Sequence, residues 1–210
     1  RAKQRRDRAA MIIILDCGSQ LTQNIARRVR EKQVYAEILP FDTPLDTLKR
    51  PDLEGIIISG GQFSCYDQGA PLYDLKIFEC GVPVNGICYG MQSMAHLLGG
   101  KVAPSQQREY GSTNVTRLRE SPIFKNITKN PLRTRMSHGD IVQRIPEGFV
   151  IVARSESDHI AAMENSERKL YAQQFHPESD QTEYGREMLD NFLRVCNAQR
   201  TYDPTKVFDT

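Results

Sequence analysis

Two short segments of the chain contain three residue types that together could perform nucleophilic hydrolysis. The first segment, residues 86–90, reads Gly-Ile-Cys-Tyr-Gly and is centred on Cys88. The second segment, residues 174–178, reads Gln-Phe-His-Pro-Glu and supplies His176 and Glu178. A cysteine thiolate is a strong nucleophile, a histidine can remove the thiol proton, and a carboxylate can orient the histidine ring. The sequence therefore predicts a catalytic triad of Cys88, His176 and Glu178.

The glycines on either side of Cys88 favour a sharp turn between a strand and a helix. Such a turn exposes its central side chain at the carboxyl edge of a sheet. At the start of a helix, the dipole and the free backbone N–H groups favour the thiolate. The N–H of Tyr89 is the predicted first donor of an oxyanion hole. A cysteine taken alone is more often a buried packing residue, and the flanking glycines make the catalytic interpretation the better one.

His176 and Glu178 follow a predicted strand, Leu170–Phe175. If the chain stays extended there, side chains two residues apart point the same way, so Glu178 can hold the imidazole of His176. Pro177 between them donates no backbone hydrogen bond, which suits the end of a strand. Without the cysteine segment, the tripeptide would be interpreted as an ordinary polar strand end.

A glycine loop and a polar tetrapeptide are further candidate parts of the site. Ser59-Gly60-Gly61 follows a predicted strand, and the N–H of Gly61 is the predicted second oxyanion donor. The loop is similar to a pyrophosphate-binding Ser-Gly-Gly-x-Asp-Ser loop, but Phe63 stands at the aspartate position and no helix follows, so nucleotide binding is rejected. Residues 137–140, Ser-His-Gly-Asp, are expected to close a strand with a polar turn, and His159 has no evident partner.

The elements that must position these residues alternate between strand and helix in the first half of the chain. The predicted strands are Met11–Asp16, Val34–Leu39, Gly55–Ser59 and Val82–Ile87, and the predicted helices are one capped by Ser19, Asp74–Cys80 and Tyr89–Leu98. This alternation predicts a mainly parallel sheet with helices on both faces. The second half is strand-rich, with runs at Ser112–Leu118, Arg133–Ser137, Phe149–Arg154, His159–Glu164 and Leu170–Phe175 before a closing amphipathic helix that ends near Val195.

Composition excludes several classes of protein. The formal net charge of +2 over 210 residues gives no global field for nucleic acid, and no apolar run is long enough to cross a membrane. The five cysteines are odd in number and not paired in spacing, which indicates reduced thiols, no metal site and a cytoplasmic location. We expect a basic, disordered tail at 1–10, one catalytic domain at 11–197 and a tail or linker at 198–210.

The motifs resemble those of the class I glutamine amidotransferases, and among these the glutaminase domain of GMP synthetase. The segments that carry the resemblance are Ile14–Gln20, Ile58–Gly61, Gly86–Gln92, Met136–Asp140 and Gln174–Glu178. The resemblance implies a flavodoxin-like α/β fold and hydrolysis of L-glutamine through a γ-glutamyl thioester on Cys88. It implies that Gln92, Ser137, His138, Gly139 and Asp140 bind glutamine. It also implies that the domain itself needs no cofactor, and that its ammonia goes to an ATP-pyrophosphatase domain or subunit that uses ATP and Mg²⁺ to aminate xanthosine monophosphate (XMP) to GMP.

Two departures from the family pattern leave alternatives open. Gln62 replaces the proline that usually follows the glycine pair, and the chain carries no synthetase portion. The alternatives are a class I amidotransferase of another pathway, a non-catalytic glutamine-binding regulatory module, and a cysteine peptidase of similar fold. The Ser-His-Gly-Asp tetrapeptide and Gln92 argue against the first and the last of these, and the complete triad argues against the second.

Overall fold

The structure is a computed structural model that describes residues 10–206, so that all but the last residue of the predicted basic tail lies outside the described part. The strands are β1 Met11–Asp16, β2 Tyr35–Pro40, β3 Leu53–Ile58, β4 Val84–Ile87, β5 Lys101–Arg117, β6 Leu132–Arg144, β7 Val150–Ser155, β8 Ile160–Asn165 and β9 Leu170–Gln173. The α-helices are α1 Thr22–Glu31, α2 Leu45–Leu48, α3 Tyr89–Leu97 and α4 Gly185–Val195, and the 3₁₀-helices are η2 Leu75–Glu79, η3 Pro122–Phe124 and η4 Pro204–Lys206.

All nine of these strands form a single sheet in the order β2-β1-β3-β4-β9-β8-β7-β5-β6. The pairings from β2 to β9 are parallel, and those from β9 to β6 are antiparallel. The predicted α/β fold is confirmed, with a parallel half built mostly from the first hundred residues and an antiparallel half built from the rest.

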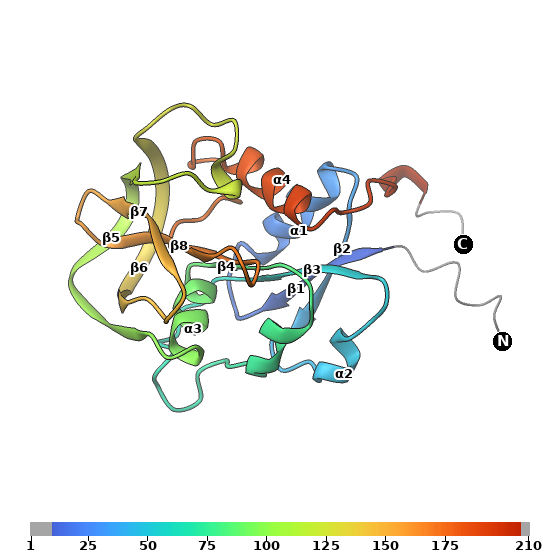
Figure 1. Ribbon diagram of the computed structural model, residues 1–210, viewed down its shortest axis with the longest axis horizontal. Coiled ribbons are helices and arrows are strands. Elements are labelled where there is room, and N and C mark those ends of the chain that lie inside the picture. Colours follow the sequence, from blue (N-terminus) through green and yellow to red (C-terminus); the bar gives the residue numbers. More distant parts are fainter. Residues whose placement is uncertain (1–9, 207–210) are drawn as a thin grey trace.

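The parallel half is apolar on both faces because helices cover both of them. Along β1, Ile12 and Ile14 pack into the core under α1 and α4, whereas Ile13 and Leu15 pack into a second core under α3. Figure 1 shows α1 and α4 on one side of these strands and α2 and α3 on the other. Alternate side chains of β1 are thus buried in two different cores, which hold the strand between the two layers of helices.

The helices differ from expectation at three places. α1 begins at Thr22, so Ser19 lies three residues before the helix and does not cap it. The Ser19 hydroxyl instead accepts from the N–H of Leu21 at 3.0 Å. The segment predicted as a helix at Asp74–Cys80 is the short 3₁₀-helix η2, in which the Asp74 carboxylate accepts from the N–H of Lys76. The four-residue helix α2 was not predicted, because one turn is too short to show an apolar period.

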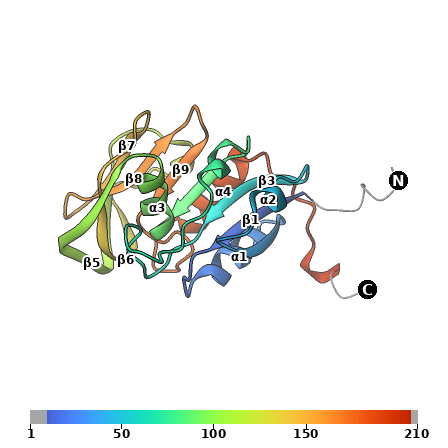
Figure 2. The ribbon, with the colours of Figure 1, turned by 90° about the horizontal axis from the view of Figure 1, so that it is seen from below.

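The antiparallel half corrects the expectation for Ser137–Asp140. These residues do not form a turn: they lie within β6, where Ser137 pairs with Tyr110 and His138 pairs with Glu109 of β5. The register between β5 and β6 is irregular between Pro104 and Glu109, so the partner strand bulges opposite the tetrapeptide. Figure 2 shows β5–β8 gathered at one end of the molecule, away from β1.

The segment after α4 returns to the parallel half. The N–H of Gln199 donates to the Glu54 carboxylate at 2.9 Å, and the ring of Tyr202 lies 5.5 Å from that of Tyr35. The segment expected to be a tail or linker therefore packs on the sheet as far as it is described. No helix within residues 10–206 has the length and apolar character that a membrane crossing requires.

Candidate active site

Cys88 occupies the predicted turn between β4 and α3. Its backbone has φ 55° and ψ −108°, a conformation that L-residues rarely adopt and that the surrounding structure must hold. The glycines beside it are sterically required, because a Cβ on Gly86 would overlap the carbonyl of Gly90 and one on Gly90 would overlap that of Ile58. The N–H of Cys88 donates to the carbonyl of Gln173 at 2.8 Å, which ties the turn to the end of β9.

The start of α3 leaves a backbone donor beside the thiol. The first intrahelical bonds run from the N–H groups of Met91 and Gln92 to the carbonyl of Cys88. The N–H of Tyr89 precedes them and belongs to the first turn, whose N–H groups have no partner within the helix. The side chain of Tyr89 is fully buried, and its hydroxyl donates to the carbonyl of Pro71. The role of the Tyr89 N–H as an oxyanion donor stays a prediction.

His176 and Glu178 meet, but not for the reason predicted. β9 ends at Gln173, and residues 176–179 form a turn in which the N–H of Ser179 donates to the carbonyl of His176. Within this turn, Nδ1 of His176 lies 2.6 Å from Oε1 of Glu178, and the Glu178 side chain is fully buried. The hydroxyl of Thr182 donates to the carbonyl of His176 and fixes the turn from the other side.

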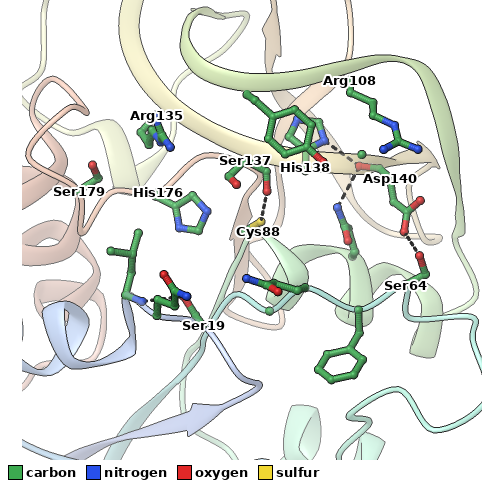
Figure 3. A pocket seen from close by; sticks show the side chains of 18 of the residues that line it. Ser19, Ser64, Cys88, Arg108, Arg135, Ser137, His138, Asp140, His176 and Ser179 are labelled. Carbon is green, nitrogen blue, oxygen red and sulfur yellow. Dashed lines mark hydrogen bonds between the residues drawn. The ribbon is translucent and has the colours of Figure 1, made fainter.

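The electrostatics of His176 favour the imidazolium. Burial lowers the pKa of His176, but the Glu178 carboxylate and the Cys88 sulfur beside it raise this pKa well above 6.5. Figure 3 shows the imidazole of His176 next to Cys88. The two side chains can therefore form a thiolate–imidazolium pair, the state from which a cysteine attacks.

The glycine loop lies against both members of this pair. A Cβ on Gly60 would come within 3.2 Å of Cε1 of His176 and 3.5 Å of Cβ of Cys88. A Cβ on Gly61 would overlap the carbonyl oxygen of Cys17. The backbone of Cys17 therefore excludes a side chain at position 61, and the His176 ring leaves little room for one at position 60.

Eight of the ten predicted site residues line one pocket of about 690 Å³, which is large enough for a free amino acid, whereas Tyr89 and Glu178 do not line it. Those in its wall are Gly61, Cys88, Gln92, Ser137, His138, Gly139, Asp140 and His176. Glu178 lies behind His176, outside the wall. The pocket therefore brings together, in one place, segments that are far apart in the sequence.

The side chain of Gln92 is hydrogen-bonded to the backbone of Asp140. Nε2 of Gln92 donates to the carbonyl of Asp140 at 3.0 Å and to Oε1 of Gln174 at 3.2 Å. The Asp140 carboxylate accepts from the hydroxyl of Ser64 at 2.5 Å and from that of Tyr66 at 2.9 Å. The loop that contains Gly61 is thus fastened to the far wall of the pocket.

His138 is less exposed than the pattern suggested. It is 5% exposed, its Nδ1 lies 2.7 Å from the carbonyl of Asp140 and its Nε2 lies 3.0 Å from Oε1 of Glu109. Burial raises the pKa of Glu109, but the hydrogen bonds from His138 and His159, together with the nearby hydroxyl of Ser155, outweigh it and hold this pKa at about 2. His159, for which the sequence indicated no partner, therefore has one in Glu109, at 3.0 Å from Nδ1.

Sequence reasoning missed several residues of the pocket. Arg108 and Arg135 bring positive charge to its wall, and Nε2 of Gln174 donates to the sulfur of Cys88 at 3.7 Å. Gln174 begins the Gln-Phe-His-Pro-Glu segment, so its closeness to His176 in the sequence could have identified it as a site residue. No such indication existed for Arg108, because the part of the strand that contains it was not predicted.

Comparison with known proteins agrees with the geometry. The family model for "Glutamine amidotransferase class-I" matches residues 13–196. A protein of Carboxydothermus hydrogenoformans named "GMP synthase [glutamine-hydrolyzing]" is 49% identical over 189 residues, and one of Aquifex aeolicus with the same name is 47% identical over 193 residues. These matches cover 90% and 91% of this chain, but it spans only 37% and 38% of the lengths of the two relatives.

Solved structures give the same result for the fold. A protein of Thermoplasma acidophilum, described as a putative subunit of GMP synthase, superposes with a TM-score of 0.81 at 28% identity, covering 90% of this chain and 95% of that one. A Thermotoga maritima glutamine amidotransferase superposes with a TM-score of 0.67 at 20% identity, covering 90% and 84% of the two chains. The second match supports the fold alone.

Proposed function

Since this chain belongs to the class-I glutamine amidotransferase family, we propose that it hydrolyses L-glutamine to glutamate and ammonia, with Cys88 as nucleophile, His176 as acid and base, and Glu178 as the group that orients His176. One observation carries the proposal. Cys88 sits on the strained turn at the start of α3, in the same pocket as a histidine whose Nδ1 is 2.6 Å from a fully buried carboxylate.

The reaction begins with transfer of the thiol proton to His176, whose raised pKa favours the imidazolium. The thiolate of Cys88 adds to the side-chain amide carbon of glutamine, and the carbonyl oxygen becomes an oxyanion. The N–H groups of Gly61 and Tyr89 donate to this oxyanion. Removal of one such donor in comparable enzymes costs roughly 10²–10³ in rate.

Collapse of this intermediate breaks the carbon–nitrogen bond. His176 gives its proton to the departing nitrogen, ammonia leaves, and a γ-glutamyl thioester remains on Cys88. His176 then removes a proton from water, and the resulting hydroxide attacks the thioester. Glutamate leaves and the thiolate is restored, so that one water is consumed and no redox step is needed.

The pocket wall supports an amino acid as the substrate. Arg108 and Arg135 provide positive charge for an α-carboxylate, and the Asp140 carboxylate provides negative charge for an α-amino group. Gln92 and Ser137–Asp140 form the remainder of the proposed glutamine site. Because the His138 ring points into the protein, we assign it to supporting the Asp140 backbone from behind.

We further propose that the ammonia serves the amination of XMP to GMP. The observation in favour is the 47–49% identity to two proteins named as glutamine-hydrolysing GMP synthases. The amination would take place on an ATP-pyrophosphatase domain or subunit that uses ATP and Mg²⁺, since the described residues offer no nucleotide loop of their own.

One experiment tests both the proposed glutamine hydrolysis and the proposed use of its ammonia. Glutamate release from glutamine is measured for the wild type and for Cys88→Ala, with and without a GMP synthetase ATP-pyrophosphatase loaded with XMP and Mg-ATP. Glutamine labelled with ¹⁵N in the side-chain amide reports whether the label reaches GMP. We expect glutamate release that depends on Cys88 and label in GMP. Release without label in GMP would support the hydrolase and contradict the pathway, and release by Cys88→Ala would contradict the mechanism.

A further inference from the structure

Beside the pocket, three side chains of types that commonly bind metals converge, and one of them, His138, also lines the pocket. Glu109 comes from β5, His138 from β6, and His159 from the residue before β8. Their side chains are 3%, 2% and 11% exposed, and one ligand atom from each lies within 4.8 Å of the other two. Oε1 of Glu109 is 3.0 Å from Nε2 of His138 and 3.0 Å from Nδ1 of His159.

The outer nitrogen of each histidine is used as a donor. Nδ1 of His138 faces the carbonyl oxygen of Asp140 at 2.7 Å, and a carbonyl can only accept, so Nδ1 carries a proton. Nε2 of His159 faces the hydroxyl of Ser105 at 3.2 Å. That hydroxyl donates to the carbonyl of Gln107 at 2.9 Å, which leaves its oxygen able to accept from Nε2 of His159.

The inner nitrogens are left facing a carboxylate. In a neutral imidazole whose outer nitrogen is protonated, the inner nitrogen carries a lone pair. The same inner nitrogens can instead carry protons and donate to the Glu109 carboxylate across the 3.0 Å gaps. Two N–H protons or one divalent cation can therefore occupy the space between these three atoms. The other carboxylate oxygen, Oε2 of Glu109, is buried and has no hydrogen-bond partner within the described residues.

We propose that Glu109, His138 and His159 bind a divalent transition-metal ion of the zinc type through Oε1, Nε2 and Nδ1. Two imidazoles and one carboxylate are a common ligand set for zinc with an open fourth position. A metal-binding histidine commonly donates its other N–H to a carbonyl or another oxygen, as both histidines do here. Ligands at 2.0–2.1 Å in a tetrahedron are about 3.4 Å apart. The two distances from Glu109 to the histidines, 3.0 Å each, need a small expansion, and the two histidine nitrogens already lie within 4.8 Å of each other.

The bound ion would affect the neighbouring pocket by holding the His138 ring in place. The carbonyl of Asp140 accepts from Nδ1 of His138 and from Nε2 of Gln92. Fixing His138 through its second nitrogen therefore fixes the Asp140 backbone and, through it, the Gln92 amide. The proposal concerns metal binding itself and stands whether or not the chain hydrolyses glutamine.

The test uses the intact chain, stripped of metal with a chelator and then titrated with Zn²⁺ against a chromophoric competitor. His159→Gln and Glu109→Gln each remove one ligand. His96→Gln is the matched control, because His96 lies on α3 and outside the cluster. We expect one Zn²⁺ per chain for the wild type and the control. Binding in either ligand variant should be weaker by at least about tenfold, since even the loss of an outer partner costs roughly 10–100-fold.

Cobalt identifies the ligands independently of affinity. Co²⁺ bound by nitrogen and oxygen lacks the thiolate charge-transfer absorption that Co²⁺ on Cys17, Cys65, Cys80, Cys88 or Cys196 would show. Circular dichroism tests whether each variant is folded. If Glu109→Gln is unfolded, the test rests on His159→Gln, which changes a less buried side chain. Absence of tight Zn²⁺ binding by the folded wild type overturns the proposal in favour of two protons. Binding that survives in His159→Gln, or that carries thiolate absorption, also overturns it.

Discussion

Nδ1 of His176 lies 2.6 Å from Oε1 of Glu178 inside a four-residue turn, and the carboxylate is completely buried. A charge so placed can serve only the ring beside it, because no solvent reaches it. Removal of the base in a catalytic triad costs up to roughly 10⁶ in kcat, and removal of the orienting acid costs less, about 10⁴. We therefore expect His176→Ala to be nearly as inactive as Cys88→Ala in glutamate release.

The orienting role of Glu178 is tested separately from that of His176. We expect Glu178→Gln to retain more activity than His176→Ala, because glutamine can still accept from Nδ1. Glu187→Gln on the exposed face of α4 is the matched control and should be fully active. Equal kcat values for Glu178→Gln and the control would show that the carboxylate does not act on the reaction.

The protonation of His176 provides a prediction on pH. Its folded pKa is raised above the unfolded value of about 6.5 by Glu178 and Cys88, against the opposing effect of burial. The resulting stabilisation is fully present below about pH 6.5 and is lost as pH rises through the folded pKa. In Glu178→Gln the burial remains and the charge is gone, so the pKa must fall. NMR titration of the His176 ring in the two proteins measures this difference, and equal midpoints would contradict it.

Burial raises the pKa of four thiols, those of Cys17, Cys65, Cys80 and Cys196, which disfavours their alkylation. Burial raises the pKa of Cys17 and of Cys65 to about 12, so neither forms thiolate near neutral pH. Burial also raises the pKa of Cys80, although this side chain is partly exposed. Because Cys88 is the cysteine that lines the pocket, a glutamine-like electrophile should label it and abolish activity.

Mass spectrometry of the labelled peptides checks this expectation. Cys80→Ser serves as the control, since it removes the one thiol that solvent reaches more easily and should leave both labelling and inactivation unchanged. Inactivation with the label on any cysteine other than Cys88 would refute the assignment of the nucleophile.

Sequence reasoning succeeded where a short segment determines its own conformation. The glycines around Cys88 and the apolar run of β1 each point to one structure, and the structure has both. Sequence reasoning failed where pairing with a distant strand determines the conformation of a segment. Ser137–Asp140 reads as a turn because glycine and aspartate favour turns, but pairing with β5 holds it extended. The contacts of His138 and His159 with Glu109 join β5, β6 and the residue before β8, and no local period could reveal them.

Gly60 is predicted to be required by the reaction and not by the fold. An added methyl would lie in ordinary contact with Cβ of Cys88, at 3.5 Å, but 3.2 Å from Cε1 of His176, so the His176 ring would have to shift by a few tenths of an ångström. Replacing glycine by alanine where the backbone allows it tends to stabilise a protein by about 0.4–1 kcal/mol. Gly60→Ala should therefore lower kcat severely while Tm stays the same or rises. A large fall in Tm would show that the glycine serves packing.

The last prediction concerns the loop after Gly61. Its far side is fastened to β6 by Ser64 and Tyr66 on the Asp140 carboxylate, whereas exposed Gln62 leaves the Gly61 peptide without the restraint that proline would give. Proline fixes its own φ and restricts the preceding residue to extended conformations. Gln62→Pro should therefore hold the Gly61 N–H in one orientation. If free rotation is what keeps the isolated chain slow, basal ammonia release should rise by up to roughly 10²–10³, the value of one oxyanion donor.

The matched control for this prediction is Gln68→Pro in the same loop. Gln68 follows Asp67 in a turn closed by the N–H of Ala70 on the Asp67 carbonyl, with Gly69 at φ 85°. Proline is well accommodated at that second turn position, so the control adds stiffness without acting on Gly61. Basal release that rises only in Gln62→Pro would assign the restraint to the Gly61 peptide. Unchanged basal release in Gln62→Pro, with strong activation by a synthetase partner in both proteins, would place the control of activity at another element.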